Sequence, residues 1–177
     1  MVVRARNGDR IALGELATIY GDRWYALAFR ILRDADQAQD VVQETIIAVW
    51  RDLRALRDPD RFEPWAWKVL VRLSYREARR ARRDSPMLFV VPAHTSDDPA
   101  KHLADRDELE RIFARLSAEQ RTVIALQYYL GMTHPQMASV LDIPVGTVGS
   151  RLHAAKRALR AALAADSRLE HLGDGPR

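Results

Sequence analysis

The 177-residue sequence contains no cysteine. This absence excludes a disulfide scaffold, a thiolate zinc site and a cysteine nucleophile. No apolar run approaches the roughly 18–20 residues that a membrane-spanning helix needs. Residues 1–14 include Arg4, Arg6 and Arg10 and lack the apolar segment of a signal peptide. We therefore expect a cytoplasmic protein that does not insert into a membrane.

The sequence also lacks the motifs of common catalytic sites. Its five histidines do not stand at metal-ligand spacing on a helix. Neither a phosphate-binding G-x-x-x-x-G-K-[ST] loop nor a G-x-S-x-G elbow occurs. No pair of carboxylates stands in an apolar setting that would shift a pKa. These absences disfavour a small helical enzyme, and we expect no catalytic residue, no metal and no cofactor.

Charge is distributed unevenly behind a net charge of +4. Residues 68–83 hold seven basic side chains and one acid, and residues 144–160 hold four basic side chains and none that is acidic. Residues 97–110 between them are rich in Asp and Glu. Two basic segments favour two contacts with a polyanion. Two solvated helix faces are the alternative.

The spacing of apolar residues predicts an all-α fold of two small helical domains. Expected helices cover 11–20, 24–32, 36–53, 65–83, 103–114, 117–129, 133–141 and 145–163. Gly21 and Asp22 are expected to separate the first two, and Pro59 and Pro64 to act as stops. Asp34, Ser117 and Thr133 are predicted caps. The domains are expected at 1–83 and 103–165, with a flexible Pro-containing linker at 84–102 and a tail at 166–177.

Residues 133–162 form a predicted helix-turn-helix, with a short helix, a three-residue turn and a longer basic helix. Small residues begin the free face of the last helix, and His and Arg follow, which suits the major groove of DNA. An ordinary helical hairpin is the alternative. The free face and its edges hold Gly146, Thr147, Ser150, Arg151, His153, Lys156, Arg157 and Arg160.

A second basic pattern lies on the expected helix 65–83. Arg72, Arg76, Arg79 and Arg83 share one face, and Trp65 stands on the same side. Arginines follow phosphates and an indole stacks on an exposed base, so the face fits single-stranded or melted nucleic acid. The alternative places Trp65 and Trp67 in the core, which we favour for Trp67 and leave open for Trp65.

The expected helix 36–53 carries an unusual open face opposite its apolar stripe. Ile47 stands there among acids and amides, which suggests a protein partner. A single stray isoleucine on a solvated face is the alternative. The face consists of Asp36, Asp40, Gln43, Glu44, Ile47 and Arg51.

Several segments together resemble a bacterial sigma factor of the extracytoplasmic-function (ECF) subgroup. Residues 34–50 read DADQAQDVVQETIIAVW and resemble the region 2 pattern D-x-x-D-A-E-D-x-x-Q-E-x-F-x-x-x-W. Residues 62–67, FEPWAW, resemble the F-x-x-W-L run that opens the promoter-melting helix. Residues 116–128, 131–138 and 143–152 resemble region 4. The resemblance covers nearly the whole chain except the linker and tail.

This resemblance implies a non-enzymatic factor that binds core RNA polymerase and promoter DNA, and that an anti-sigma factor often holds inactive. The region 2 helix would bind the polymerase clamp through Asp36, Asp40, Gln43, Glu44 and Ile47. The following loop and basic helix would open and read the minus-ten element with Phe62, Trp65, Arg72, Arg76, Arg79, Arg80 and Arg83. The helix-turn-helix would read the minus-thirty-five element with Thr147, Ser150, Arg151, His153, Lys156, Arg157 and Arg160.

Two positions depart from the family pattern. Arg72 and Arg76 stand where Asn and Asp are usual, so we expect a stronger hold on phosphate and an altered minus-ten preference. Gly149 stands where Lys is frequent, and glycine within a helix costs about 0.5–1 kcal/mol relative to alanine. We expect a looser last helix with one phosphate contact fewer.

The runner-up interpretation is a one-component helix-turn-helix regulator whose N-terminal block is a sensor. A sensor block should enclose an apolar ligand pocket. A sigma factor should instead expose the acidic face at 36–51 and a basic stripe, and these features distinguish the two interpretations.

Overall fold

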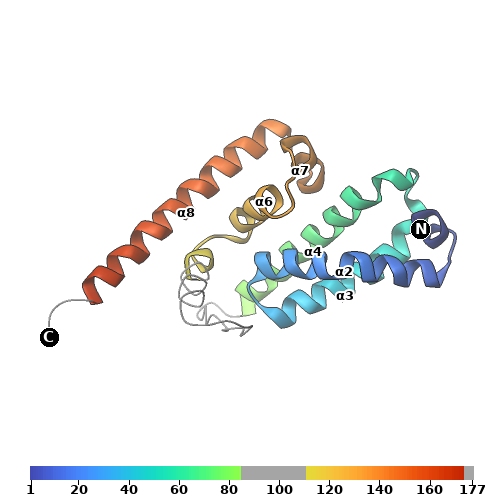
Figure 1. The fold of residues 1–177 in the computed structure, drawn as a ribbon, viewed down its shortest axis with the longest axis horizontal. Helices are drawn as coiled ribbons and strands as arrows, with labels where there is room; N and C mark the ends of the chain where they lie inside the picture. The colour runs from blue at the N-terminus through green and yellow to red at the C-terminus, as the bar shows by residue number, and fades with distance from the viewer. Residues whose placement is uncertain (85–110, 174–177) are drawn as a thin grey trace.

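The computed structural model describes residues 1–84 and 111–173, with only the backbone given for 84 and 166–173. These residues are helical and contain no strand, in agreement with the predicted all-α class (Figure 1). The first block comprises α1 (Val2–Arg6), α2 (Arg10–Leu32), α3 (Ala35–Asp52), short 3-10 turns at Leu53–Ala55 and Pro59–Arg61, and α4 (Phe62–Asp84). The second comprises α6 (Ala118–Tyr128), α7 (His134–Leu141) and α8 (Val145–Gly173).

α2 is one continuous helix, so the predicted break at Gly21 and Asp22 is wrong. A glycine inside a helix costs only about 0.5–1 kcal/mol, and packing across this position outweighs that cost. Tyr20 stacks on Trp24 with ring centroids 5.6 Å apart. Trp24 is 1% exposed and anchors this half of α2 in the core. Aromatic packing therefore holds the helix together where local propensity predicts a break.

α3 begins where the sequence predicts. The side chain of Asp34 accepts a hydrogen bond from the backbone N–H of Gln37 at 2.9 Å. An acceptor at this position satisfies one of the backbone donors that a helix start leaves free. Ala38, Val41 and Val49 on the inner face are at most 2% exposed. The cap and the apolar stripe together fix both the start and the orientation of α3.

We expect Asp34→Ala to lower the free energy of unfolding by about 1 kcal/mol, the usual cost of losing an N-cap. Asp34→Asn keeps an acceptor oxygen at the same place and should recover most of the loss. Urea titration followed by circular dichroism measures both variants. Equal destabilisation by the two substitutions would show that the cap does not hold this end of α3.

α4 starts earlier than predicted. Pro64 lies in its first turn rather than stopping a helix, because the first residues of a helix do not need their N–H groups for internal hydrogen bonds. Trp67 is 1% exposed, which confirms its predicted place in the core. Its indole N–H donates to Glu63 at 3.2 Å. The buried Trp67 side chain, hydrogen-bonded to Glu63, therefore anchors the first turns of α4.

The helix-turn-helix has the predicted order and caps. Ser117 and Gln120 form the capping box of α6. The side chain of Gln136 accepts from the backbone N–H of Thr133 at 2.8 Å before α7. Asp142 turns the chain into α8 with a left-handed φ of 58°. α8 continues to Gly173, so the helix extends past both its predicted end at 163 and the predicted start of the tail.

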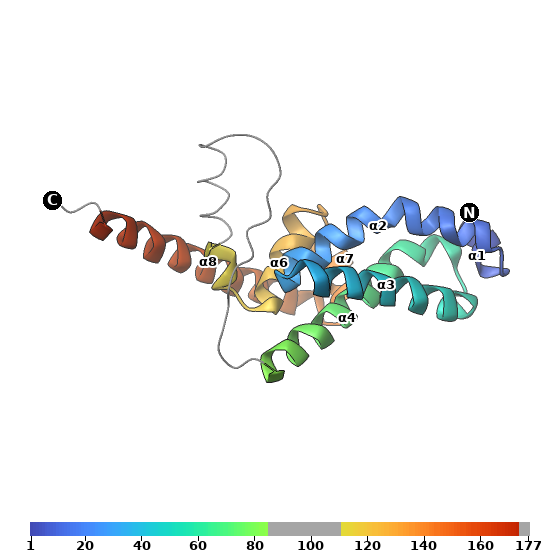
Figure 2. The ribbon, with the colours of Figure 1, turned by 90° about the horizontal axis from the view of Figure 1, so that it is seen from below.

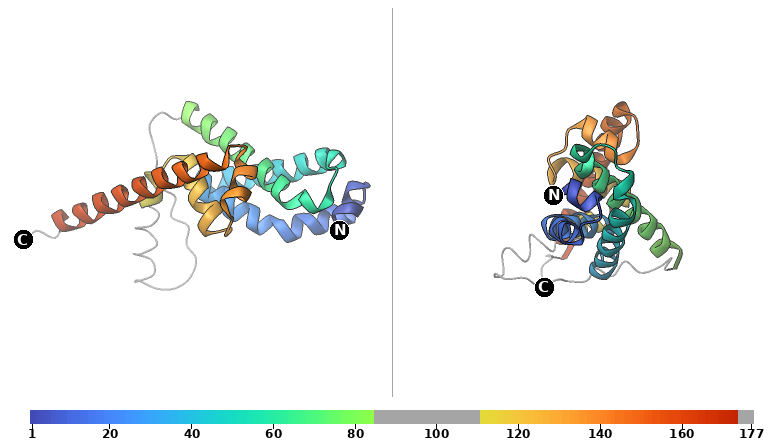
Figure 3. Two further views of the ribbon diagram at one scale, coloured as in Figure 1. Left: turned by 90° about the horizontal axis from the view of Figure 1, so that it is seen from above. Right: turned by 90° about the vertical axis from the view of Figure 1, so that its right-hand side faces the viewer.

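The two blocks pack against each other. α2 lies along α6, and α4 lies against α7 (Figures 2 and 3). Buried apolar residues of both blocks form one contiguous cluster, from Leu27 and Ile31 of α2 to Leu126 of α6 and Met137 of α7. The C-terminal part of α8 points away from the rest of the molecule (Figure 1). Most of the predicted linker 84–102 and residues 103–110 of the predicted helix 103–114 lie outside the described residues.

Candidate nucleic-acid and protein interfaces

The outer face of α3 presents polar and apolar side chains together. Asp36, Asp40 and Gln43 are exposed, as predicted from the helical spacing. Ile47 is 58% exposed. Trp50, one turn further on, is 51% exposed, and the Arg10 guanidinium lies 5.8 Å from its ring centroid. We call Asp36, Asp40, Gln43, Ile47 and Trp50 the α3 face.

The sequence patterns did not single out Trp50 as part of this face. Tryptophan normally buries its large apolar surface, and its position in the sequence adjoins the buried Val49. The helical spacing from Ile47 was the available signal, because residues three apart share a face. Tryptophan is also enriched among the residues that dominate binding at protein interfaces.

Glu44 is less free than its neighbours on α3. It forms an ion pair with Arg76 of α4, which joins the edge of the α3 face to the basic helix. The side chains remain 43% and 61% exposed, so the pair is screened by water and contributes little to stability. A partner of the α3 face therefore meets Glu44 already paired with a cation.

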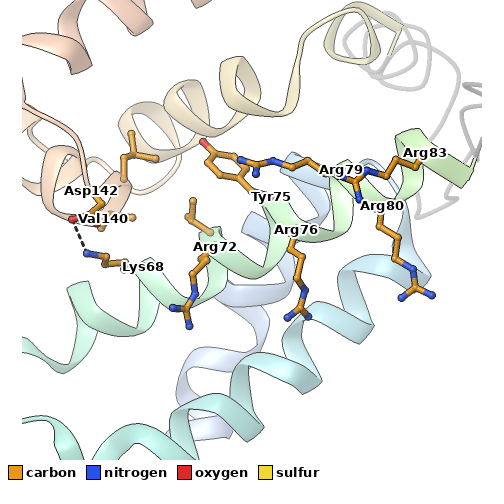
Figure 4. A pocket seen from close by; sticks show the side chains of 11 residues that line it. Lys68, Arg72, Tyr75, Arg76, Arg79, Arg80, Arg83, Val140 and Asp142 are labelled. Carbon is orange, nitrogen blue, oxygen red and sulfur yellow. Dashed lines mark ion pairs between the residues drawn. The ribbon is translucent and has the colours of Figure 1, made fainter. Parts of the chain in front are cut away.

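The basic side of α4 lines a groove of about 950 Å³ beside α7 (Figure 4). Figure 4 shows Arg72, Arg76 and Arg80 projecting from one side of α4, whereas Arg79 lies beside Tyr75. Burial raises the pKa of Tyr75 above its ordinary value. We call this the basic groove. It is lined by Lys68, Val71, Arg72, Tyr75, Arg76, Arg79, Arg80, Arg83, Val140, Leu141 and Asp142.

Phe62 is not placed to contact nucleic acid. It is 2% exposed and packs edge-on against Tyr20, with ring centroids 5.4 Å apart. The prediction of a DNA contact by Phe62 is wrong for this arrangement, because the start of α4 turns its ring into the core. Trp65 is half-buried against the same core, and its centroid lies 6.1 Å from that of Phe62. Part of its ring remains accessible to a stacked base.

Most of the side chains predicted to lie on the outer face of α8 are exposed. Its inner stripe is closed, since Val148, Leu152 and Ala155 are at most 4% exposed. Lys156 is half-buried, and its ammonium lies 5.5 Å from the Tyr128 ring centroid. Gly149 has no atom near the position of a Cβ, so a larger side chain would fit there. The exposed residues of this face are Ser150, Arg151, His153, Arg157 and Arg160.

The described residues contain no group of three His, Asp or Glu side chains arranged to hold a metal ion. In 1–84 and 111–173, none of the helices combines the length and the apolar character needed to cross a membrane.

Comparison with known proteins identifies the family. Residues 16–84 match the model of sigma-70 region 2, and residues 106–159 match that of sigma-70 region 4. The chain is 38% identical over 141 residues to the ECF RNA polymerase sigma factor SigL of Mycobacterium tuberculosis, covering 77% of this chain and 80% of that protein. The chain belongs to the ECF sigma factors. It binds core RNA polymerase and directs promoter-specific initiation of transcription.

Other similar proteins align with a larger share of this sigma factor than SigL does. It is 30% identical to the RNA polymerase sigma-H factor of Pseudomonas aeruginosa over 92% of each chain. Its fold matches CnrH, solved in complex with the cytosolic domain of CnrY, with a TM-score of 0.67 and 28% identity over 93% of this chain and 96% of that one. RpoE of Bartonella quintana, solved with the anti-sigma factor NepR, matches with a TM-score of 0.69 and 23% identity, covering 85% and 96%.

Proposed function

We propose that this sigma factor uses three separate surfaces, one for polymerase and two for the promoter. Region 2, at 1–83, binds core polymerase with the α3 face and the opened minus-ten element with α4. Region 4, at 103–165, binds the minus-thirty-five element with α8. It acts by binding, as a non-enzymatic factor. The observation that carries the proposal is the exposure of one acidic and apolar face and two basic faces on a single chain.

The α3 face has the composition of a protein interface. Ile47 and Trp50 supply exposed apolar area one turn apart. Asp36 and Asp40 supply negative charge that favours a basic partner surface. Nucleic acid would be repelled by these carboxylates, so we assign the face to core polymerase.

The basic groove has the composition of a site for opened DNA. Arg72 and Arg76 project from the same side of α4, and Arg79 lines the same groove beside Tyr75, so all three offer cations to the phosphates of a bound strand. Trp65 stands at the start of this helix with part of its ring accessible. With Phe62 in the core, stacking on an unpaired base falls to Trp65. We propose that Arg80 and Arg83 extend the phosphate contacts toward the end of α4.

The outer face of α8 suits the major groove of DNA. Small residues at its start allow the backbone to approach DNA, and the free N–H groups of the first turn favour a phosphate there. Ser150, His153 and Arg157 lie one turn apart along the centre, where side chains reach base edges. We propose that Thr147, Arg151, Lys156 and Arg160 contact phosphates at the sides.

We expect Arg157→Ala to relax preference at one or two base pairs of the minus-thirty-five element, at a cost of roughly 1–3 kcal/mol if it pairs with guanine in bidentate fashion. Lys156→Ala is the matched control, because it removes one cation from the same turn at the side of the face. It should weaken binding to every sequence about equally. A promoter library bound at one fixed salt concentration measures both. An unchanged preferred sequence in Arg157→Ala, with an altered one in Lys156→Ala, would mean that α8 is rotated differently in the groove.

We also propose that an inhibitory protein, an anti-sigma factor, binds this sigma factor. RpoE was solved with an anti-sigma factor and CnrH with the cytosolic domain of CnrY. The exposed apolar residues of the α3 face offer such an inhibitor the same surface that core polymerase uses.

Footprinting of a reconstituted holoenzyme tests whether the chain binds two promoter elements through two separate surfaces. The full chain is combined with core polymerase on a promoter selected from genomic fragments. We expect protection at two elements and reactivity of unpaired bases at the minus-ten element. Protection at a single site, without strand opening, would favour the one-component regulator.

A further inference from the structure

We infer that Tyr128 of α6 is a positioning residue for DNA binding, whose ring holds the Lys156 ammonium in place for a phosphate beside the minus-thirty-five element. The inference extends this site from the helix-turn-helix to the last turn of α6. It rests on the proposed function, because it uses the assignment of α8 to the minus-thirty-five element and of Lys156 to a phosphate at the side of that helix.

The packing of α6 on α8 brings these two side chains together. Tyr128, the last residue of α6, is 63% exposed, whereas Leu126 is completely buried and holds the same turn in the core. The Lys156 ammonium lies 5.5 Å from the Tyr128 ring centroid. At that distance a cation is attracted to the face of an aromatic ring. The two residues therefore form a cation–π pair between α6 and α8.

Lys156 points toward α6 because of its place around α8. With 3.6 residues per turn, it lies about 100° around the helix from Arg157 and only about 40° from the buried Leu152. It is half-buried, as expected of a lysine whose methylene stem covers apolar surface and whose ammonium reaches the outside. This edge of the helix is where side chains meet phosphates rather than base edges.

An aromatic ring holds this cation without neutralising it. Other cations in the described part of the chain are paired with carboxylates, as Lys68 is with Asp142 and Arg76 with Glu44. Such a carboxylate competes with phosphate for the cation. Within residues 1–83 and 111–165, Lys156 forms no ion pair. It keeps its charge, and the ammonium N–H groups turned away from the ring can donate to a phosphate oxygen.

The ring also prepares Lys156 before DNA arrives. A flexible lysine side chain loses rotamer entropy when it is fixed on a phosphate. Because the ring already restricts the side chain in the free protein, less entropy is lost on binding. The end of α6 adds to this effect, since the C-terminus of a helix carries the negative end of its dipole and favours a nearby cation.

Binding of reconstituted holoenzyme to promoter DNA tests the inference in the full chain. Tyr128→Leu removes the ring but keeps an apolar side chain, and it should weaken binding to every sequence about three- to tenfold, the effect of losing one preordered side chain. Tyr128→Phe keeps a ring that attracts the cation, and it should bind within about twofold of the wild type. Tyr129→Leu is the matched control, because it removes the neighbouring ring, which faces Arg30 instead. It should leave binding unchanged.

A double-mutant cycle with Lys156→Ala shows whether the ring acts through the lysine. Lys156→Ala should lower the slope of log affinity against log salt by about 0.9, the value for one phosphate contact on duplex DNA. Tyr128→Leu/Lys156→Ala should bind like Lys156→Ala alone, because the ring then has no cation to hold. Effects that multiply would overturn the inference. So would equal weakening by Tyr128→Phe and Tyr128→Leu, or a changed base preference in Tyr128→Leu.

Nuclear magnetic resonance reports the pair directly in the free chain. The only lysines in the sequence are Lys68, Lys101 and Lys156, so isotopically labelled lysine gives few ε-methylene signals, and Lys156→Ala identifies one of them. The ring current of an aromatic side chain shifts a methylene above its face upfield. We expect an upfield Lys156 signal in the wild type and in Tyr128→Phe, and its loss in Tyr128→Leu. An unshifted signal in the wild type would overturn the inference, whatever the variants do.

The binding results also distinguish a failure of the inference from a failure of the proposed function. If Lys156→Ala weakens binding and Tyr128→Leu does not, the inference is overturned and the proposed function stands. If Lys156→Ala binds every sequence like the wild type, the phosphate contact proposed for Lys156 is wrong and the inference falls with it.

Discussion

The double variant Asp40→Ala/Ile47→Ala is expected to bind core RNA polymerase roughly 30- to 150-fold more weakly than the wild type, the effect of losing a central cluster worth about 2–3 kcal/mol. Ile47, which is 58% exposed, supplies apolar surface for contact with polymerase. Asp40, two turns before Ile47, supplies a negative charge complementary to a basic partner surface. Both side chains point away from the core, so thermal unfolding should stay unchanged. Titration of labelled core polymerase measures the affinity.

The matched control for this variant is Ile11→Ala/Asp22→Ala. It also removes one exposed isoleucine, 72% exposed, and one exposed aspartate, but from α2. The control should bind core polymerase like the wild type. Similar weakening in both variants would mean that the loss reflects overall charge or stability, and the assignment of the α3 face would be wrong.

The triple variant Arg72→Ala/Arg76→Ala/Arg79→Ala is expected to have the second largest effect, on promoter DNA. Each arginine that contacts a phosphate contributes about 0.7–0.9 to the slope of log affinity against log salt. Three lost contacts should lower that slope by about 2–3 and weaken holoenzyme binding on the order of 100-fold at 0.15 M salt. Holoenzyme is assembled at saturating concentration, so that the Arg76–Glu44 pair beside the α3 face does not limit the result.

A comparison of two single variants distinguishes the effect of an arginine's position on α4 from the effect of removing any one positive charge. Arg72→Ala and Arg4→Ala each remove one exposed arginine, from α4 and α1 respectively. Only Arg72→Ala should lower the salt slope, by about one unit, and it should do so on every sequence. A loss that depends strongly on the bases of the minus-ten element would show that Arg72 reads sequence instead of following phosphates.

The parts of the fold that could be predicted from the sequence are those that depend on nearby residues, namely helix caps and apolar stripes. The buried stripe and cap of α3 follow from residue spacing and from Asp34. The capping box at Ser117 and the inner stripe of α8 follow from equally local rules. These features involve residues within a few turns of each other, so periodicity and side-chain chemistry suffice to predict them.

Features that depend on distant residues were not predictable in this way. Arg121 and the Ile31 carbonyl are 90 residues apart, and an arginine in a helix gives no sign that a carbonyl elsewhere will bury it. The burial of Phe62 depends on Tyr20 of another helix. The continuity of α2 through Gly21 depends on the burial of Trp24 among its neighbours. Each of these outcomes was decided by tertiary packing, which overrides local propensity.

Run-off transcription with core polymerase tests the central claim most directly. Genomic fragments are transcribed by core polymerase with and without the chain, and the transcripts are sequenced. The account predicts transcripts that require the chain and whose start sites share two upstream elements with fixed spacing. Chain-independent transcripts, or starts without a common pair of elements, would contradict it.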